Sequence, residues 1–117
     1  MKTFQTNALR IAELMGWKYN PIFKQSTLDC NTYFTDAVKI SSNEELIELF
    51  SSYNGLMPIV FKCNADINYR IHIYEECVIF STADGEMLLP KLKYELEHEF
   101  IEALQLAVIK YLELKNG

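Results

Sequence analysis

The stretch "NYRIHIYEECVIFST", residues 68–82, constrains the fold most, because apolar and polar side chains alternate on both sides of a short acidic tip. Alternation with a period of two is typical of a β-strand, and two such runs around a tip predict a β-hairpin. Antiparallel pairing across the tip at 75–76 places Ile73 opposite Val78. The apolar face of this register holds Tyr69, Ile71, Ile73, Val78, Phe80 and Thr82.

The other face of the predicted hairpin is mixed in character. It holds Arg70, His72, Tyr74, Cys77, Ile79 and Ser81. We expect such a face either to lie under a partial cover or to contact other molecules. The pair Asp84-Gly85 follows as a strong turn signal, and we expect a short third strand directly after it, in "EMLL".

Helical spacing marks three other parts of the chain. Residues 3–15 repeat apolar side chains at steps of three and four, and Gly16 follows as an expected C-terminal cap. Ser42 and Glu45 have the spacing of a capping box before a helix over 43–54. A long amphipathic helix is predicted from about Lys91 to Leu114. Its apolar face holds Leu96, Phe100, Ala103, Leu104, Ala107, Val108, Tyr111 and Leu112.

The stretch "YNGLMPIVFKC", residues 53–63, fits either a buried strand or a bend followed by a short second helix. Pro58 favours the helix, because a proline is accommodated in the first helical turn but removes a hydrogen bond from a central strand. The helix would place Leu56, Met57, Val60 and Phe61 on one side. Together these elements predict an α+β domain over 1–117, in which helices cover both faces of a small, mainly antiparallel sheet.

Composition excludes several function classes. The chain has 117 residues, of which 50% are hydrophobic, so a core forms without metals or disulfides. Its formal charge of −5 and its two scattered arginines argue against nucleic-acid binding, which depends on clustered cations. Three cysteines without Cys-x-x-Cys spacing are expected as reduced thiols that are buried or half-buried. The sequence shows no signal peptide and no apolar run of membrane-spanning length, so we expect a soluble cytoplasmic protein.

His98 belongs to a possible metal-binding pattern. On a helix Glu95, His98 and Glu102 would share one face, and Glu-x-x-His occurs in di-iron helical bundles. Those bundles use the pattern twice and add further glutamates, whereas this chain has it once. The alternative is a solvated acidic helix face, which we favour because one histidine and loose carboxylates do not close a metal site.

His72 is the other candidate for chemistry. It lies on the mixed face of the hairpin, where Cys77 sits diagonally and Ile79 directly opposite. A Cys–His pair would need an orienting group and an oxyanion site, and the sequence shows neither. A partly buried histidine, hydrogen-bonded to a neighbour, is the simpler interpretation. We therefore assign no catalytic, cofactor-binding or metal-binding residue and predict no cofactor.

Three stretches resemble a known family. They are "AELMGWK" at 12–18, "LMP" with "IVFK" at 56–62, and "EFIEALQLAVIKYLELKN" at 99–116. In this order they resemble the small phage and prophage proteins of the α/β/α-sandwich type, which have no established activity. Phe61 stands where that family usually has a glutamate, and the helix over 43–54 is longer or inserted. The resemblance implies a fold and a phage origin, and it favours the helix over 56–62.

Three functions stay open at this stage. The first is a non-catalytic, phage-derived accessory protein that binds an unknown protein partner in the bacterial cytoplasm, without nucleic acid or membrane. The second is a small enzyme that uses His72 or the face of Glu95, His98 and Glu102. The third is a structural subunit that associates with copies of itself. We favour the first, because no recognisable active site is assembled by the sequence.

Overall fold

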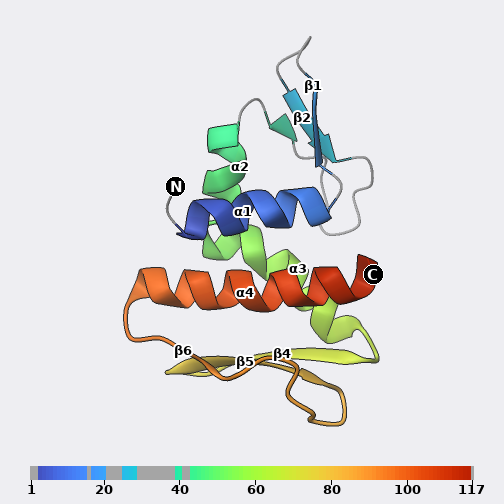
Figure 1. Cartoon of the computed structure of the whole chain (residues 1–117), viewed down its shortest axis with the longest axis vertical. Helices are drawn as coiled ribbons and strands as arrows, with labels where there is room; N and C mark the ends of the chain where they lie inside the picture. Colours follow the sequence, from blue (N-terminus) through green and yellow to red (C-terminus); the bar gives the residue numbers. More distant parts are fainter. Residues whose placement is uncertain (1–2, 16, 21–24, 29–38, 41–42, 117) are drawn as a thin grey trace.

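The computed structural model describes residues 3–15, 17–20, 25–28, 39–40 and 43–116, whose arrangement is shown in Figure 1. Within these residues the elements follow in the order α1 (Thr3–Leu14), β1 (Trp17–Asn20), β2 (Gln25–Leu28), β3 (Lys39–Ile40), α2 (Asn43–Leu49), α3 (Tyr53–Ala65), β4 (Tyr69–Ile73), β5 (Cys77–Thr82), β6 (Leu92–Lys93) and α4 (Glu97–Asn116). The predicted capping residues Ser42 and Gly16 lie outside the described part.

The predicted hairpin is confirmed. β4 and β5 pair antiparallel, with Ile71 opposite Phe80 and Ile73 opposite Val78, as the alternation required. β6 pairs with the other side of β5, which gives a three-stranded antiparallel sheet in the order β4-β5-β6. The chain is therefore an α+β protein, as predicted.

The third strand lies later in the sequence than expected. After the turn, where Gly85 has a φ of 95°, only one isolated bridge forms, between Met87 and Ser81. The paired strand is β6, in which Lys93 lies opposite Cys77. The segment "KLKY" alternates with a period of two, and this pattern fits a sheet edge better than the helix to which we had assigned it.

α4 consequently begins at Glu97 rather than at Lys91. The side chain of Glu99 accepts a hydrogen bond from the backbone N–H of Leu96, at 3.1 Å. This contact occupies one of the backbone donors that the first turn of a helix leaves without a helical partner. Leu96 precedes the helix and is 58% exposed, so its predicted place on the apolar face is wrong.

Residues 53–63 are helical, as favoured, but the helix begins earlier than Pro58. The hydroxyl of Ser52 accepts the N–H of Gly55 at 3.2 Å and caps α3, while donating to the Leu49 carbonyl at the end of α2 at 2.9 Å. Pro58 thus lies in the second turn of α3. The predicted burial of Phe61 is wrong, because its side chain is 64% exposed.

Gly55 allows α2 and α3 to meet in a tight junction. It is buried in the first turn of α3, and a Cβ there would lie 1.7 Å from the carbonyl oxygen of Leu49. No side chain fits in this space. Glycine is therefore required because the two helix ends approach each other closely.

The helices form layers on one side of the sheet (Figure 1). α3 and α4 contact the sheet, and α1 packs against the far side of α4. One contiguous core of buried apolar residues joins these layers. We predicted helices on both faces of the sheet, whereas α3 and α4 lie on the same face. The other face carries Arg70 and His72, and an antiparallel sheet tolerates one face in water.

A second sheet, of order β1-β2-β3, lies beyond α1 (Figure 1). Its strands pair antiparallel, with Trp17 opposite Leu28 and Ser26 opposite Ile40. The strands are only two to four residues long, so their alternation is too brief to be recognised.

An asparagine side chain covers part of the outer edge of β4. The amide of Asn64, on α3, donates to the Ile71 carbonyl at 3.0 Å and accepts the Ile71 N–H at 2.6 Å. These backbone groups point away from β5, where a further strand would otherwise pair. The contact protects an edge strand against pairing with other chains.

Candidate functional site

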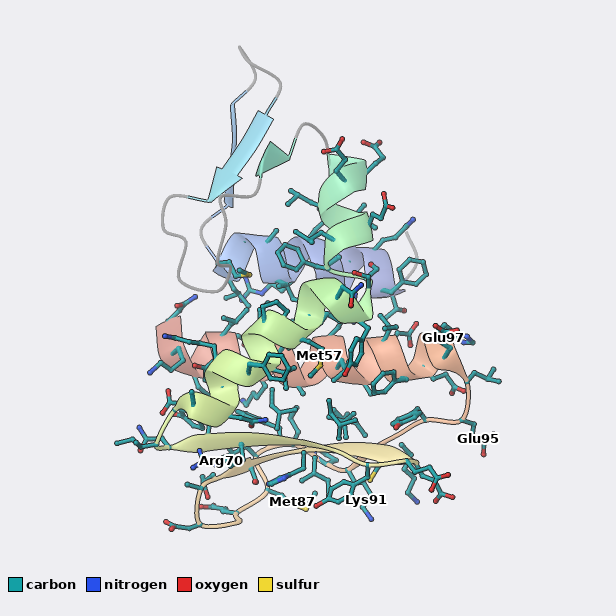
Figure 2. All side chains as sticks on the ribbon, turned by 180° about the vertical axis from the view of Figure 1, so that it is seen from behind. Met57, Arg70, Met87, Lys91, Glu95 and Glu97 are labelled. Carbon is teal, nitrogen blue, oxygen red and sulfur yellow. The ribbon has the colours of Figure 1, made fainter. Side chains whose placement is uncertain are left out.

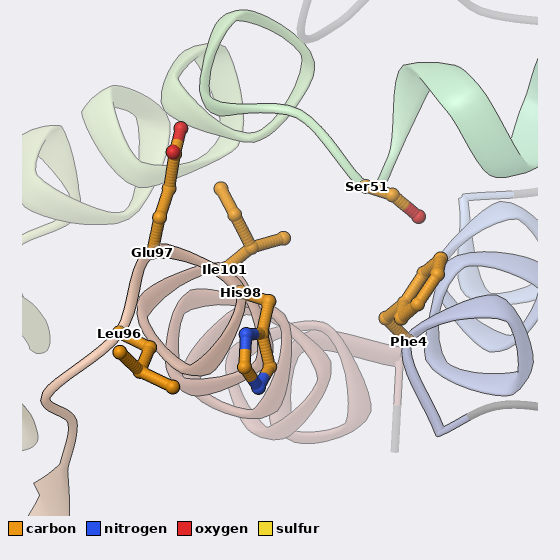
Figure 3. A pocket seen from close by; sticks show the side chains of 6 residues that line it. All are labelled: Phe4, Ser51, Leu96, Glu97, His98 and Ile101. Atoms are coloured by element: carbon orange, nitrogen blue, oxygen red, sulfur yellow. The ribbon is translucent and has the colours of Figure 1, made fainter.

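The first candidate site is a hollow of about 440 Å³ where α4 begins (Figure 3). Its lining residues come from α1, from the junction of α2 and α3, and from the start of α4. They are Phe4, Ser51, Leu96, Glu97, His98 and Ile101. Figure 3 shows that the side chains of Glu97 and His98 point apart, with Ser51 across the hollow. The hollow combines apolar walls with polar groups that do not converge.

The predicted face of Glu95, His98 and Glu102 is not formed. Glu95 lies on the connection before α4, as Figure 2 shows, so it does not share a helical face with the other two. Glu102 lines a different hollow, between β6 and α4. In the part of the chain that the structure describes, no three histidine, cysteine, aspartate or glutamate side chains group closely enough to hold a metal ion.

Gln105 is a buried polar residue that links the helices, and the sequence did not reveal this role. Its side chain is fully buried at the base of the junction between α1, α2–α3 and α4. The amide nitrogen donates to the carbonyl oxygens of Phe50, at 2.7 Å, and Phe4, at 3.0 Å. A glutamine inside an amphipathic helix resembles any solvent-facing residue in sequence, so only the tertiary contacts identify it.

The second candidate site is the face of the sheet that points away from α3 and α4; we call it the outer sheet face. Alternation along the strands places on it Arg70, His72, Tyr74, Cys77, Ile79, Ser81, Met87, Lys91 and Lys93. Figure 2 shows Met87 and Lys91 on this side of the sheet. No helix in the described ranges covers it. The sequence predicted the contributions of β4 and β5 and missed those of residues 87–93.

His72 is exposed on this face, and the Cys–His pair considered from sequence is not formed. The register places His72 opposite Ile79, as predicted, while Cys77 lies opposite Lys93. The ring of His72 instead lies near that of Tyr74, with centroids 6.1 Å apart. The expected hydrogen bond from His72 to a neighbour is also absent from the described residues.

A hollow of about 440 Å³ lies at the hairpin end of the outer sheet face. It is lined by Tyr74, Glu75, Glu76, Cys77, Ile79 and Lys91. An adjoining hollow contains Tyr94, whose hydroxyl donates to the Tyr74 carbonyl. Burial raises the pKa of Tyr94, and the nearby Cys77 and Glu75 raise it further. Tyr94 is therefore a neutral donor that holds the end of the hairpin in place.

Two of the predicted reduced thiols are seen, and both are buried; Cys30 lies outside the described residues. Burial, reinforced by the charge of Asp66 and opposed by Arg70, raises the pKa of Cys63 to about 12. The thiolate is the reactive form of cysteine, so this thiol is chemically inert at neutral pH. Cys63 is a core residue of α3.

Comparison with known proteins adds no assignment: no family model, no curated protein and no solved structure matches the chain. The resemblance to phage α/β/α-sandwich proteins therefore stays a prediction. Among the described residues, no helix combines the length and apolar character needed to cross a bilayer.

Proposed function

We propose that the protein is a non-catalytic protein-binding module that acts through its outer sheet face. The supporting observation is that this face, which no helix in the described part of the chain covers, exposes apolar and aromatic side chains. An antiparallel sheet face in water is usually polar. Here Tyr74 is 52% exposed and Met87 is 48% exposed, and Ile79 on β5 is partly exposed. Exposed apolar and aromatic side chains within a polar rim are typical of protein-binding surfaces.

The geometry favours binding over catalysis. General acid–base chemistry needs a histidine or carboxylate held by an orienting partner. Within the described residues, neither His72 nor His98 is held by a hydrogen bond, and the two lie on different parts of the molecule. Metal-dependent chemistry at His98 is not favoured, because Glu95 lies outside α4.

The proposed setting rests on the sequence resemblance alone. A phage or prophage origin would place the module in the cytoplasm of a bacterial host, with a host or phage protein as its partner. The charge of −5 supports a protein rather than a nucleic-acid partner, since phosphate contacts need clustered cations.

The experiment compares surface variants in binding to a partner from bacterial lysate. Tagged protein should retain one partner, identified by mass spectrometry and confirmed by saturable titration with the purified components. The double variant His72→Glu, Met87→Glu changes exposed positions of the outer sheet face and should lose the partner. The variant Phe61→Glu changes an apolar side chain on α3 that is more exposed than Met87, and it should keep the partner. Circular dichroism verifies that both variants are folded.

The opposite pattern refutes the proposal. Loss of the partner in Phe61→Glu alone would place the binding surface on α3. Recovery of the protein only with copies of itself, with light scattering showing a stable oligomer, would instead identify a self-associating subunit.

A further inference from the structure

A chemically reactive pair of residues lies at the start of α3. The sequence has Asn-Gly at 54–55 and at 116–117, and the structure describes both residues of the first pair. In such a pair the backbone nitrogen of the glycine can attack the side-chain amide carbon of the asparagine, because no Cβ on the glycine hinders the approach. Ammonia leaves and a cyclic imide forms, which water opens to aspartate or to isoaspartate. The net reaction consumes one water and releases one ammonia, so it needs no other reactant.

The fold holds the attacking nitrogen of this pair in place. The N–H of Gly55 donates to the Ser52 hydroxyl at 3.2 Å, and that hydroxyl donates in turn to the Leu49 carbonyl at 2.9 Å. Gly55 is buried, whereas Asn54 is exposed to water. Both residues lie in the first turn of α3, where helical backbone angles keep the Gly55 nitrogen away from the side-chain amide carbon of Asn54. Local structure therefore blocks a reaction that the sequence alone would allow.

We propose that Asn54 is a latent modification site, which forms the cyclic imide only when the junction of α2 and α3 opens. Opening releases the Gly55 N–H from the Ser52 hydroxyl and frees the backbone angles of both residues of the pair. Helix ends open locally at a lower free energy than the core of a domain, so the junction opens without unfolding of the whole chain. Because the loss of ammonia is irreversible, the reaction turns a transient opening into a permanent covalent change.

The two products of the reaction have opposite effects on the junction. Aspartate at position 54 adds a negative charge in the first turn of α3, where the helix dipole favours it. Isoaspartate instead adds a methylene group to the main chain directly before Gly55. The junction has no room for this group, since even an added Cβ on Gly55 would lie 1.7 Å from the Leu49 carbonyl oxygen. Isoaspartate therefore prevents the junction from closing again in its original geometry.

The test follows the reaction at Asn54 by peptide mapping and mass spectrometry during incubation in mildly alkaline buffer, which speeds ring closure. The folded chain should react about tenfold or more slowly than the same chain unfolded in guanidinium chloride. Ser52→Ala removes the hydroxyl that holds the Gly55 N–H and should speed the reaction in the folded chain by about fivefold, the change in local opening that a lost helix cap produces. Ser52→Thr keeps a hydroxyl and should react as slowly as the parent.

The matched control is Thr82→Ala, which removes a hydroxyl that accepts the Glu86 N–H at 3.1 Å, far from the junction in sequence, and should leave the rate at Asn54 unchanged. Circular dichroism verifies that the variants are folded. A folded parent that reacts as fast as the unfolded chain, a folded Ser52→Ala that reacts no faster than the parent, or an equal acceleration in Thr82→Ala would overturn the proposal. If Ser52→Ala does not fold, the comparison of the folded and unfolded parent still decides.

Discussion

Replacing Gln105 by leucine tests the contact that joins α4 to α1 and to the α2–α3 junction. Leucine keeps most of the buried volume but removes the two shortest hydrogen bonds that the amide donates, at 2.7 Å to Phe50 and 3.0 Å to Phe4. It also removes the longer contacts with the Ser51 hydroxyl and with the Asn7 amide. A hydrogen bond contributes about 1 kcal/mol net, and a buried carbonyl that loses its donor costs roughly 1–3 kcal/mol. We therefore expect the free energy of unfolding to fall by about 2–4 kcal/mol.

Urea denaturation followed by circular dichroism measures this change. The control is Leu106→Gln, the next residue of α4, which is 40% exposed and should change the free energy of unfolding by less than about 1 kcal/mol. Gln105→Glu should be more damaging than leucine at neutral pH and partly recover in acid, because a buried carboxylate would face carbonyl oxygens. A leucine variant as stable as the parent would show that Gln105 does not hold the helices together.

Three further changes test other contacts. Gly55→Ala should destabilise by about 3 kcal/mol or more in urea denaturation, because its Cβ would overlap the Leu49 carbonyl; a loss below about 1 kcal/mol would contradict the tight junction. Asn64→Leu should speed hydrogen exchange of the Ile71 amide, whereas Asn64→Asp, which keeps the acceptor, should preserve protection; equal exchange in both would exclude the edge contact. Asp66→Asn should lower the free energy of unfolding at neutral pH. If the variant were still less stable than the parent in strong acid, the ionised Asp66 carboxyl would not be the cause of the loss.

The pH dependence of the last prediction follows from the contacts of Asp66. The backbone N–H of Asn68, at 2.9 Å, and then the Lys115 ammonium, at 3.0 Å, hold the pKa of this carboxyl below its ordinary value. A lowered pKa in the folded state stabilises the protein above the pKa of the unfolded chain. The advantage over Asp66→Asn should therefore be present at neutral pH. It should decline as the pH falls below about 4 toward the folded-state pKa.

Local patterns predicted the fold where one periodicity governed a whole element. The hairpin register followed from alternation alone, and Ile71 and Phe80 pair as the sequence required. The sequence failed where two structures compete for a short segment. Residues 91–93 continue the helical spacing that follows them, yet they form the edge strand of the sheet. Their pairing with β5 satisfies backbone groups of β5 that would have no partner in the sheet if the helix began at Lys91.

The candidate site was predictable only in part for the same reason. The mixed face of β4 and β5 was recognised from alternation, including His72 and Ile79. The lysines of the outer sheet face were missed because they were assigned to a helix. Gln105 could not have been found, since its importance lies in carbonyl groups far away in the sequence.

The most direct test of the central claim places a photo-crosslinking amino acid on opposite surfaces of the protein in living bacteria. At His72 or Met87, on the outer sheet face, irradiation should give one discrete adduct with another protein. At Phe61 on α3, or at Glu113 on the exposed side of α4, it should give none. Adducts at Phe61 or Glu113, with none at His72 and Met87, would contradict the account.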